Sequence, residues 1–584
     1  MSSSPPLPTP TPPIREEIAL QRATVARLKK DILGIDRNAR RRYIREFHEE
    51  FSHLEGPSSF DDLVVACFKA DLVYIGDYHA LPSSQEFAAR LLREIADRAS
   101  EVVLCLEMVY TRSQKVLDRF MTGEIGEEEF LKGIRYDLDW GYDWKSFRRL
   151  FDVARERGIA VFGVDCEPRS GLRYIGKRDM HAAARIAEIV QQRPRAKIVV
   201  LIGESHLARN HLPRKVTDNL KRRALERRGV IVLQNLEEIY WQLAERGQQQ
   251  ADVVTLGPDR FCVFNTSPIA KYEAYRQTLE AWQGDPEDQG DVDLSSTVYS
   301  MIDTILRFLR VDKYTHVVKR SGRPGDFLID IYPEVYSGLD DKELRHLLQA
   351  HEFSAEEVEE IADHVANRGS CYVPRMNAIF IGRLNLVHAG EEAAHFVNLA
   401  LKGEVYDDAP REMPQHDLFY NGVLEEALGF FGSKLIDPGR NHFFETAFYQ
   451  YYRKDRETIE RETAYTYEDF NAIIHFILLH KKFEQNYGTY EDVPPEILAG
   501  IRSEPRRANI LIHELGYFLG QQLHDAYRAG VIDRRDIARL FRDSFRQSGS
   551  ALKTYLDLTE RVRPALQEGS TPQPSPGDGG SEAP

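Results

Sequence analysis

The hydrophobic and polar positions of the chain follow two patterns, which change over at about residue 265. Between about residues 60 and 265, short apolar runs rich in β-branched residues alternate with segments of helical periodicity. The apolar runs are Leu72–Ile75, Val102–Leu106, Ile159–Val164, Ile198–Ile202 and Val230–Leu233. Runs that are apolar throughout and separated by helical crossovers are typical of a parallel sheet covered on both faces. We therefore predict an open, mostly parallel α/β domain with helices on both faces of its sheet.

Beyond about residue 293 the helical period dominates. The clearest helical segments are Glu356–Ala366, Glu391–Leu401, Asp417–Leu435, Phe470–Phe483 and Ile510–Ala529. Two short strand-like runs, His316–Lys319 and Phe327–Ile331, interrupt the pattern near its start. The pattern predicts a mainly α-helical C-terminal region of one or two domains.

Changes in composition suggest where these parts begin and end. The N-terminus is rich in Ser, Pro and Thr and the C-terminus in Gly, Pro and Ser, which is typical of disorder. We expect a disordered segment over 1–13, a helical segment over 14–58, the α/β domain over 59–266, a helix and acidic linker over 267–292, mainly helical domains over 293–566, and a disordered tail over 567–584.

Charge and cysteine content narrow the class of protein. The 584 residues include 77 Lys and Arg against 92 Asp and Glu, a formal charge of −15, which disfavours a dedicated nucleic-acid binder. No apolar run approaches the roughly 20 residues of a membrane span, and no signal peptide is visible. The five cysteines are far apart and form no C-x-x-C pair, which favours a reducing compartment. We expect a cytoplasmic protein with a small-molecule ligand and no nucleic-acid partner; the sequence is compatible with a homodimer.

Polar side chains follow four of the predicted strands. The pattern G-x-x-H occurs after the first strand, at Gly76 and His79, and after the fourth, at Gly203 and His206; Glu107 follows the second strand and Asp165 the third. The carboxyl ends of parallel strands meet at one edge of the sheet, where ligands bind in open α/β folds. Two imidazoles and a carboxylate form an open catalytic metal set, and without a metal they can deprotonate water. The alternative is an ordinary turn histidine or edge ion pair at each position.

These motifs together resemble the ChaN-like haem-binding proteins and the superfamily that joins them with Tiki proteases and erythromycin esterases. The resemblance covers about residues 60–245 and rests on both G-x-x-H motifs, Glu107, the Arg178-Asp179 pair and the stretch GVDCEPR at 163–169. It implies that His79, Glu107 and His206 are the catalytic or metal-binding residues. As further groups, it nominates Asp77 and Glu204 as metal ligands, with Arg178 and Asp179 in support. Because the iron of haem is held by His or by Tyr phenolate in proteins, Tyr78 is a further candidate haem ligand, and Arg169 or Arg178 could pair with the haem propionates.

The sequence departs from the family pattern in three places. It has no lipoprotein signal, Asp77 stands where we expect Glu, and positions 182 and 183 are both Ala. Three functions stay open: binding of haem or a divalent transition metal, metal- or His-dependent hydrolysis of an ester or amide, and a non-catalytic scaffold.

The helical region holds a second candidate metal set. His388, Glu392 and His395 follow one another at i, i+4 and i+7, which places them on one face of a helix. The Glu392-x-x-His395 spacing is that of di-iron helical bundles, which need a second such motif and two more glutamates. The sequence offers no second motif nearby, so a purely structural cluster is the alternative.

Overall fold

The structure is a computed structural model. It describes residues 11–35, 42–169, 174–249, 251–283, 294–318, 323–382, 385–406, 413–440, 454–462, 465–486, 493–503 and 505–569. The predictions of disorder at residues 1–10 and 570–584, and most of the predicted acidic linker, lie outside these residues. The chain divides into two compact units, the first spanning residues 21–292 and the second residues 11–20 and 293–584. Helix α1 (Pro12–Ile35) contributes to both.

The first unit is built on an eight-stranded sheet of order β1-β7-β8-β6-β2-β5-β3-β4. Its strands are β1 Gly56–Ser58, β2 Leu72–Asp77, β3 Val102–Tyr110, β4 Ala160–Asp165, β5 Lys197–Gly203, β6 Gly229–Gln234, β7 Val253–Gly257 and β8 Arg260–Val263. All neighbouring pairs are parallel except β1 with β7 and β7 with β8. The predicted class, an open and mostly parallel α/β sheet, is therefore confirmed.

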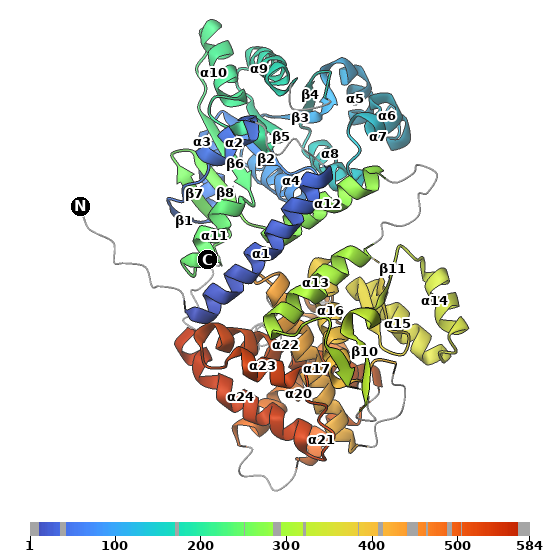
Figure 1. Ribbon diagram of the computed structural model, residues 1–584. Helices are drawn as coiled ribbons and strands as arrows, with labels where there is room; N and C mark the ends of the chain where they lie inside the picture. The colour runs from blue at the N-terminus through green and yellow to red at the C-terminus, as the bar shows by residue number, and fades with distance from the viewer. Residues whose placement is uncertain are drawn as a thin grey trace, which may run out of the picture. The chain divides into compact units, whose positions relative to one another are not determined.

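Helices cover both faces of this sheet (Figure 1). The helices are α2 Arg42–Glu50, α3 Phe60–Lys69, α4 Pro82–Ala96, α5 Gln114–Met121, α6 Glu127–Ile134, α7 Tyr136–Asp139, α8 Trp144–Glu156, α9 Ile175–Gln192, α10 Leu212–Arg222, α11 Glu237–Glu245 and α12 Pro268–Gln283. Successive side chains of a strand point to opposite faces. Val73 and Ile75 accordingly join the core beneath α4 and α8, whereas Leu72 and Tyr74 join the core beneath α9 and α10. Burial on both faces explains why the strands read as continuous apolar runs.

Two details of the sheet differ from the sequence pattern. Strand β3 does not end at Glu107 but continues to Tyr110, with an irregular register against β4 between Leu106 and Tyr110. The pattern also missed β1, β7 and β8, which extend the sheet at one edge. These strands are only three to five residues long, too short for an apolar period to stand out.

The second unit is mainly helical, as predicted. Its helices are α13 Ser295–Leu309, α14 Asp341–Ala350, α15 Ala355–Arg368, α16 Leu386–Lys402, α17 Gln415–Ile436, α19 Arg456–Glu462, α20 Tyr467–Gln485, α21 Pro495–Ile501, α22 Pro505–Ala529, α23 Arg534–Leu540 and α24 Ser550–Gly569. Its strands are β9 His316–Val318, β10 Pro324–Phe327, β11 Glu334–Ser337, β12 Ser370–Val373 and β13 Ala378–Ile381. Helix α17 is buried on nearly every side, as expected of a central helix without a polar face.

One predicted strand is wrong. Of the run Phe327–Ile331, only Phe327 lies in a strand, and Leu328–Ile331 form a 3₁₀ turn. The backbone N–H groups of Leu328 and Ile329 donate to carbonyls of the loop at residues 313–315. The run therefore satisfies its hydrogen bonds without pairing along a strand.

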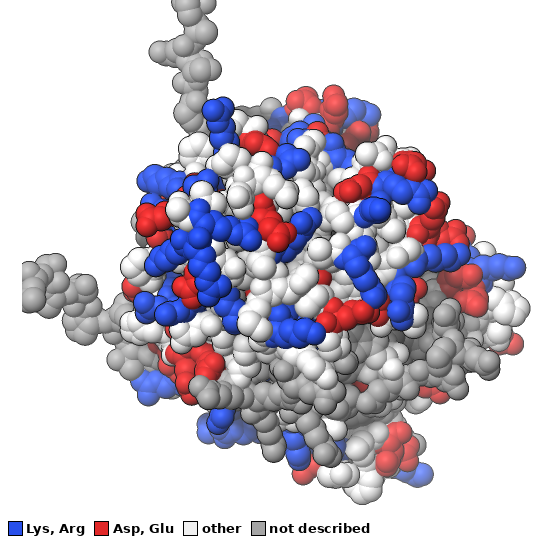
Figure 2. Space-filling view, turned by 90° about the horizontal axis from the view of Figure 1, so that it is seen from above, with Lys and Arg blue, Asp and Glu red and all other residues white. Residues whose placement is uncertain are grey.

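Charged side chains of both signs occur on the surface. Figure 2 shows Lys and Arg side chains interspersed with Asp and Glu on the face that it draws. None of the described helices is long and apolar enough to cross a membrane.

Candidate active site

The two G-x-x-H histidines lie on either side of Glu107 at the carboxyl edge of the sheet. His79 Nε2 is 3.6 Å from Glu107 Oε2, and His206 Nε2 is 3.4 Å from Glu107 Oε1. The strand order β2-β5-β3 causes this meeting, because β5 lies between the strand that precedes His79 and the strand that carries Glu107. Residues 127 positions apart in the chain thus face one carboxylate.

Each histidine is held from behind by an aspartate. Asp77 Oδ2 lies 2.7 Å from His79 Nδ1, and Asp179 Oδ1 lies 2.6 Å from His206 Nδ1. An Nδ1–H that donates to a carboxylate fixes the orientation of the ring and turns Nε2 toward the site. The result is a continuous array, Asp77–His79–Glu107–His206–Asp179.

The second G-x-x-H motif shows why its glycine is needed. After Gly203 the chain forms a short 3₁₀ turn, Glu204–Leu207, which carries His206 back over the sheet edge. The Gly203 N–H donates to Glu107 Oε2 at 2.6 Å. A Cβ on Gly203 would lie 3.2 Å from His79 Nε2 and 3.4 Å from Glu107 Oε2. A side chain here would therefore press on both groups.

Arg178 neutralises the buried acid at the centre. Its guanidinium donates to Glu107 Oε1 and to both oxygens of Asp165, at 2.9 and 2.7 Å for Asp165. Burial alone would raise the pKa of Glu107, but the positive charges of His206 and Arg178 outweigh it and hold that pKa well below its usual range. Glu107 is therefore a carboxylate at neutral pH.

His206 carries the complementary charge. Burial alone would lower its pKa, but Glu107 and Asp179 outweigh this effect and raise the pKa of His206 to about 9. The ring is 4% exposed, so His206 is a buried imidazolium at neutral pH rather than a base that solvent reaches.

Asp179 has two further partners that the sequence analysis did not name. The Tyr43 hydroxyl donates to its Oδ2 at 2.5 Å, and Lys215 Nζ lies 2.9 Å from the same oxygen. Burial opposes ionisation, but the hydrogen bonds from His206, Tyr43 and Lys215 lower the pKa of Asp179. Tyr43 stacks on His211 with ring centroids 3.5 Å apart. Neither Tyr43 nor Lys215 stands in a motif, so nothing in the sequence pattern distinguishes them.

Other nominated residues lie near the site but do not contact its histidines in the same way. Arg169 pairs with Asp165 at 2.9 Å and donates to the backbone carbonyls of Glu107 and Asp139, so it braces the loop around Glu107. Glu204 is paired with Lys271 Nζ, at 3.0 Å.

Tyr78 also faces Lys271. The Lys271 Nζ lies 4.4 Å from the centroid of the Tyr78 ring. Because Glu204 is paired with Lys271, the second motif supplies His206 but no acid that acts on it as Asp77 acts on His79. Asp179 from α9 takes that position instead.

Solvent reaches the array at His79. The His79 side chain is 19% exposed, against 5% for Glu107. The rings of Trp140 and Tyr142 lie beside it, with centroids 4.4 and 5.2 Å from the imidazole. A ligand that enters the site therefore meets His79 and an aromatic wall first.

A single metal ion held by both histidines and Glu107 does not fit this arrangement. Two ligands of one such ion, with bonds of about 2.0–2.2 Å, lie at most about 4.3 Å apart. The atoms of His79, Glu107 and His206 do not all approach one another this closely. Among the described residues, the three side chains whose ligand atoms all lie within 4.8 Å of one another are Glu391, Glu426 and His513.

The metal set predicted in the helical region is split in the structure. Glu392 accepts a hydrogen bond from the Tyr372 N–H at 2.9 Å, and burial raises its pKa to about 7. His388 Nδ1 is 3.9 Å from Glu391 Oε2, and His395 lies one turn further along the same helix. The carboxylate directed toward other ligands is Glu391, the neighbour of the residue predicted.

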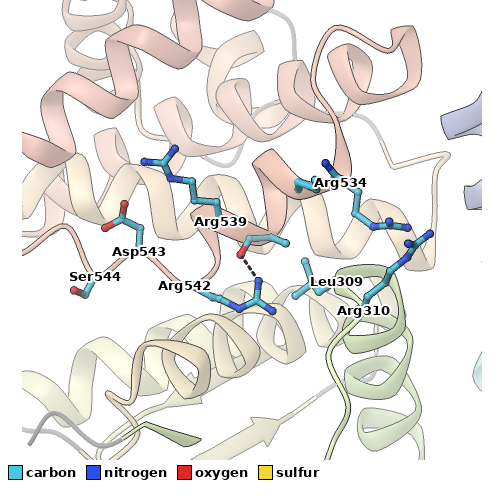
Figure 3. A pocket seen from close by; sticks show the side chains of 9 residues that line it. Leu309, Arg310, Arg534, Arg539, Arg542, Asp543 and Ser544 are labelled. Atoms are coloured by element: carbon cyan, nitrogen blue, oxygen red, sulfur yellow. Dashed lines mark hydrogen bonds between the residues drawn. The ribbon is translucent and has the colours of Figure 1, made fainter. Parts of the chain in front are cut away.

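A separate cavity lies in the second unit (Figure 3). It has a volume of about 660 Å³ and is lined by Leu309, Arg310, Arg534, Arg535, Ala538, Arg539, Arg542, Asp543 and Ser544. Glu16 pairs with Arg534 and with Arg310, so part of the positive charge is neutralised within the unit. None of the residues predicted for the site lines this cavity.

A known protein family matches part of the first unit. Residues 63–188 match the sequence model of a family described as "Haem-binding uptake, Tiki superfamily, ChaN". This match confirms the resemblance predicted for that part of the chain. No curated protein matches the chain.

Three solved structures are similar to parts of it. ChaN of Campylobacter jejuni, with cofacially bound haem, is 15% identical over 30% of this chain and 86% of its own, with a TM-score of 0.23. The type III effector HopBA1 is 15% identical over 37% and 97%, with a TM-score of 0.27. The C-terminal region of Pasteurella multocida toxin is 16% identical over 33% and 26%, with a TM-score of 0.22.

Proposed function

We propose that this site hydrolyses an ester or amide bond of a small molecule, with His79 as the general base. The observation that supports this proposal is the array Asp77–His79–Glu107, in which the partly exposed imidazole lies between two carboxylates. Asp77 holds the ring with Nε2 turned toward the site, where a positioned imidazole can take a proton from water and Glu107 faces the charge that forms.

The chemistry requires only water and the substrate. His79 Nε2 takes a proton from a water molecule while the water oxygen bonds to the carbonyl carbon, and the C=O electron pair moves to its oxygen. When the tetrahedral intermediate collapses, the leaving alkoxide or amine takes the proton from His79. Glu107 stabilises the imidazolium, and Arg178 and His206 keep Glu107 ionised.

Hydrolysis of p-nitrophenyl esters and anilides by the full chain tests this proposal. We expect His79→Gln to lower kcat/KM by about 10²–10⁴, the contribution of a positioned base. The matched control is His53→Gln, because His53 is an exposed histidine outside the site. A chain with no activity above the uncatalysed rate, or equal rates in wild type and His79→Gln, contradicts the proposal.

Haem binding at His79 is the second candidate function. It is favoured by the family description that matches residues 63–188 and by the Trp140 and Tyr142 rings beside the exposed edge of His79. An imidazole whose Nδ1 is held by an aspartate fits the role of an axial iron ligand, and the bound haem would supply redox or oxygen chemistry. Arg169 has its nitrogens engaged with Asp165 and backbone carbonyls, so it does not offer a free guanidinium to a propionate.

Titration with haem separates the two candidates. A Soret band that is lost in His79→Ala but kept in Tyr78→Phe supports haem binding through His79, because the Tyr78 ring faces Lys271. A Soret band of equal strength in wild type and His79→Ala, or none in either, contradicts it.

A further inference from the structure

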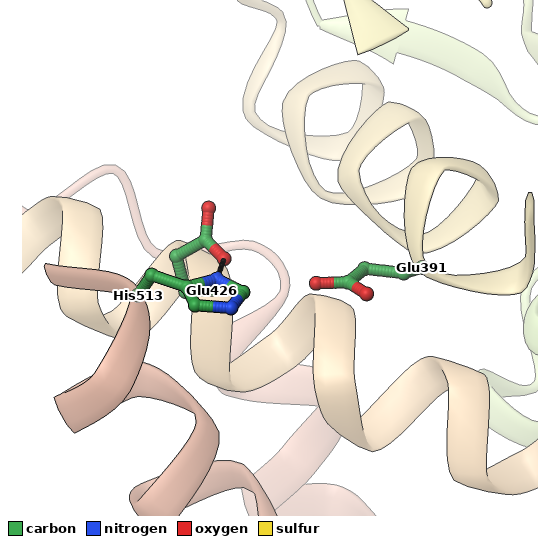
Figure 4. Close-up of side chains that lie close together, drawn as sticks. All are labelled: Glu391, Glu426 and His513. Atoms are coloured by element: carbon green, nitrogen blue, oxygen red, sulfur yellow. Dashed lines mark hydrogen bonds and ion pairs between the residues drawn. The ribbon is translucent and has the colours of Figure 1, made fainter. Parts of the chain in front are cut away.

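Three helices of the second unit bring two carboxylates and an imidazole together, away from the site described above. Glu391 lies on α16, Glu426 on α17 and His513 on α22. One ligand atom from each lies within 4.8 Å of the others, and Figure 4 shows the Glu391 carboxylate directed toward the Glu426–His513 pair. We propose that these three residues bind a divalent transition-metal ion, with the side chain of His395 lying beside the site.

The three side chains are largely shielded from water. Their exposed fractions are 4% for Glu391, 13% for His513 and 19% for Glu426. Two carboxylates that approach one another in a shielded site repel, so such a pair is stable only with positive charge nearby. His513 Nδ1 is 3.0 Å from Glu426 Oε2, and Arg440 lies 2.9 Å from Glu391 Oε2. A cation between the carboxylates would satisfy both at once.

His395 provides an independent observation. Its Nε2 is buried and has no hydrogen-bond partner among the described residues. A buried polar atom left without a partner costs about 1–3 kcal/mol, so such atoms call for a ligand. His395 is four residues after Glu391 on α16, and residues at this spacing share a helix face.

Gly429 on α17 makes room for both of these side chains. A Cβ on Gly429 would lie 2.0 Å from His395 Nε2 and 3.2 Å from Glu391 Cγ. Gly429 is also one helical turn after Glu426, so Glu391, His395 and Glu426 converge on the same stretch of α17. The absence of a side chain at this point allows the convergence.

Surrounding residues orient the proposed ligands. The Tyr517 hydroxyl donates to both oxygens of Glu391, at 2.6 and 2.7 Å, and its ring lies against His513 with centroids 3.7 Å apart. Metal ligands are commonly held by hydrogen bonds of this kind from an outer layer of residues. An imidazole and two carboxylates suit Zn²⁺, Fe²⁺ or Mn²⁺ better than Ca²⁺, which prefers oxygen ligands.

Metal titration of the full chain tests the proposal. After treatment with a chelator, the protein is titrated with Co²⁺, whose visible absorption reports nitrogen and oxygen ligands, and equilibrium dialysis measures bound Zn²⁺. We expect one ion per chain. Glu426→Gln keeps the shape of the side chain and removes a ligand charge, so we expect its affinity for Zn²⁺ to fall at least tenfold. His513→Asn is the second variant, and circular dichroism verifies that both are folded.

Two controls make the result specific. Glu425→Gln changes the neighbouring carboxylate, which accepts from Lys402 and Asn421 rather than facing the ligand set, and should bind Zn²⁺ as the wild type does. His206→Gln alters the α/β site and should also leave the affinity unchanged, so this test is independent of the proposed hydrolysis. No stoichiometric Zn²⁺ or Co²⁺ in the wild type, or equal affinity in Glu426→Gln, overturns the proposal and leaves an ion-pair cluster.

Discussion

Asp179 and His206 lie 27 positions apart in the chain, yet Asp179 Oδ1 is 2.6 Å from His206 Nδ1 inside the α/β unit. Together with Glu107, Asp179 keeps His206 protonated at neutral pH. The buried half of the site is thus a fixed ion cluster, and the half at His79 is open to a ligand.

The raised pKa of His206 predicts a stability that depends on pH. The folded-state pKa is about 9 and the unfolded value about 6.5, so the protonated ring stabilises the fold fully below pH 6.5. This contribution, about 3 kcal/mol, is lost as the pH rises through 9. Urea unfolding at pH 6.5 and 9.5 measures it.

Asp179→Asn and His206→Gln are the matched variants for that experiment. Both should show a smaller loss of unfolding free energy between the two pH values than the wild type, because the first lowers the pKa of His206 and the second removes the titrating group. Equal losses in all three proteins would show that His206 does not titrate in this range.

Arg178→Gln should destabilise the α/β unit strongly. It leaves the buried Glu107 and Asp165 carboxylates without the cation that pairs with both. Breaking a buried ion pair costs about 3–5 kcal/mol. Arg112→Gln is the control, because its ion pair with Glu167 is half exposed and worth under about 1 kcal/mol. Denaturant unfolding compares the two, and similar losses for both variants would contradict the assigned role of Arg178.

Gly203→Ala should impair the site more than the fold. The added methyl lies 3.2 Å from His79 Nε2, so the imidazole must shift by a few tenths of an ångström. We expect lower kcat/KM on the ester that the wild type hydrolyses, or a weaker Soret band, with little change in Tm. The control is Gly176→Ala in α9, where the methyl meets no atom within 4 Å. Unchanged behaviour of Gly203→Ala in both assays would mean that the His79 position is not critical.

The cysteines should differ in reactivity. Cys67, Cys105 and Cys262 are buried free thiols, and burial raises their pKa values to about 12. Since the thiolate is the reactive form, they should resist iodoacetamide at pH 8 in the folded chain. Cys166 is partly exposed, so it should be labelled first, as peptide mass spectrometry can measure. Early labelling of Cys105 would indicate that the sheet opens readily.

Much of the candidate site could be predicted from the α/β pattern. Parallel strands end at one edge, so polar residues that follow apolar runs must gather there, and His79, Glu107 and His206 lie together for that reason. The family resemblance nominated Asp77 as a metal ligand, and the structure places its carboxylate against His79 Nδ1.

The helical unit shows the limit of such patterns. The spacing selected Glu392, but Glu391 is the residue directed toward Glu426 and His513. Adjacent helical residues point about 100° apart, and the periodicity of α16 does not tell which direction faces α17 and α22.

The sequence by itself determined the parallel sheet, the helical second unit and the pairing of each histidine with a strand end, because local periodicity and turn chemistry act over a few residues. The family resemblance nominated Arg178 and Asp179, but only the tertiary structure decided what these two residues contact and added Tyr43, since helix packing sets which distant charges become neighbours in the interior. Burial then strengthens the electrostatic interactions between those charges, because the protein interior screens them less than water does.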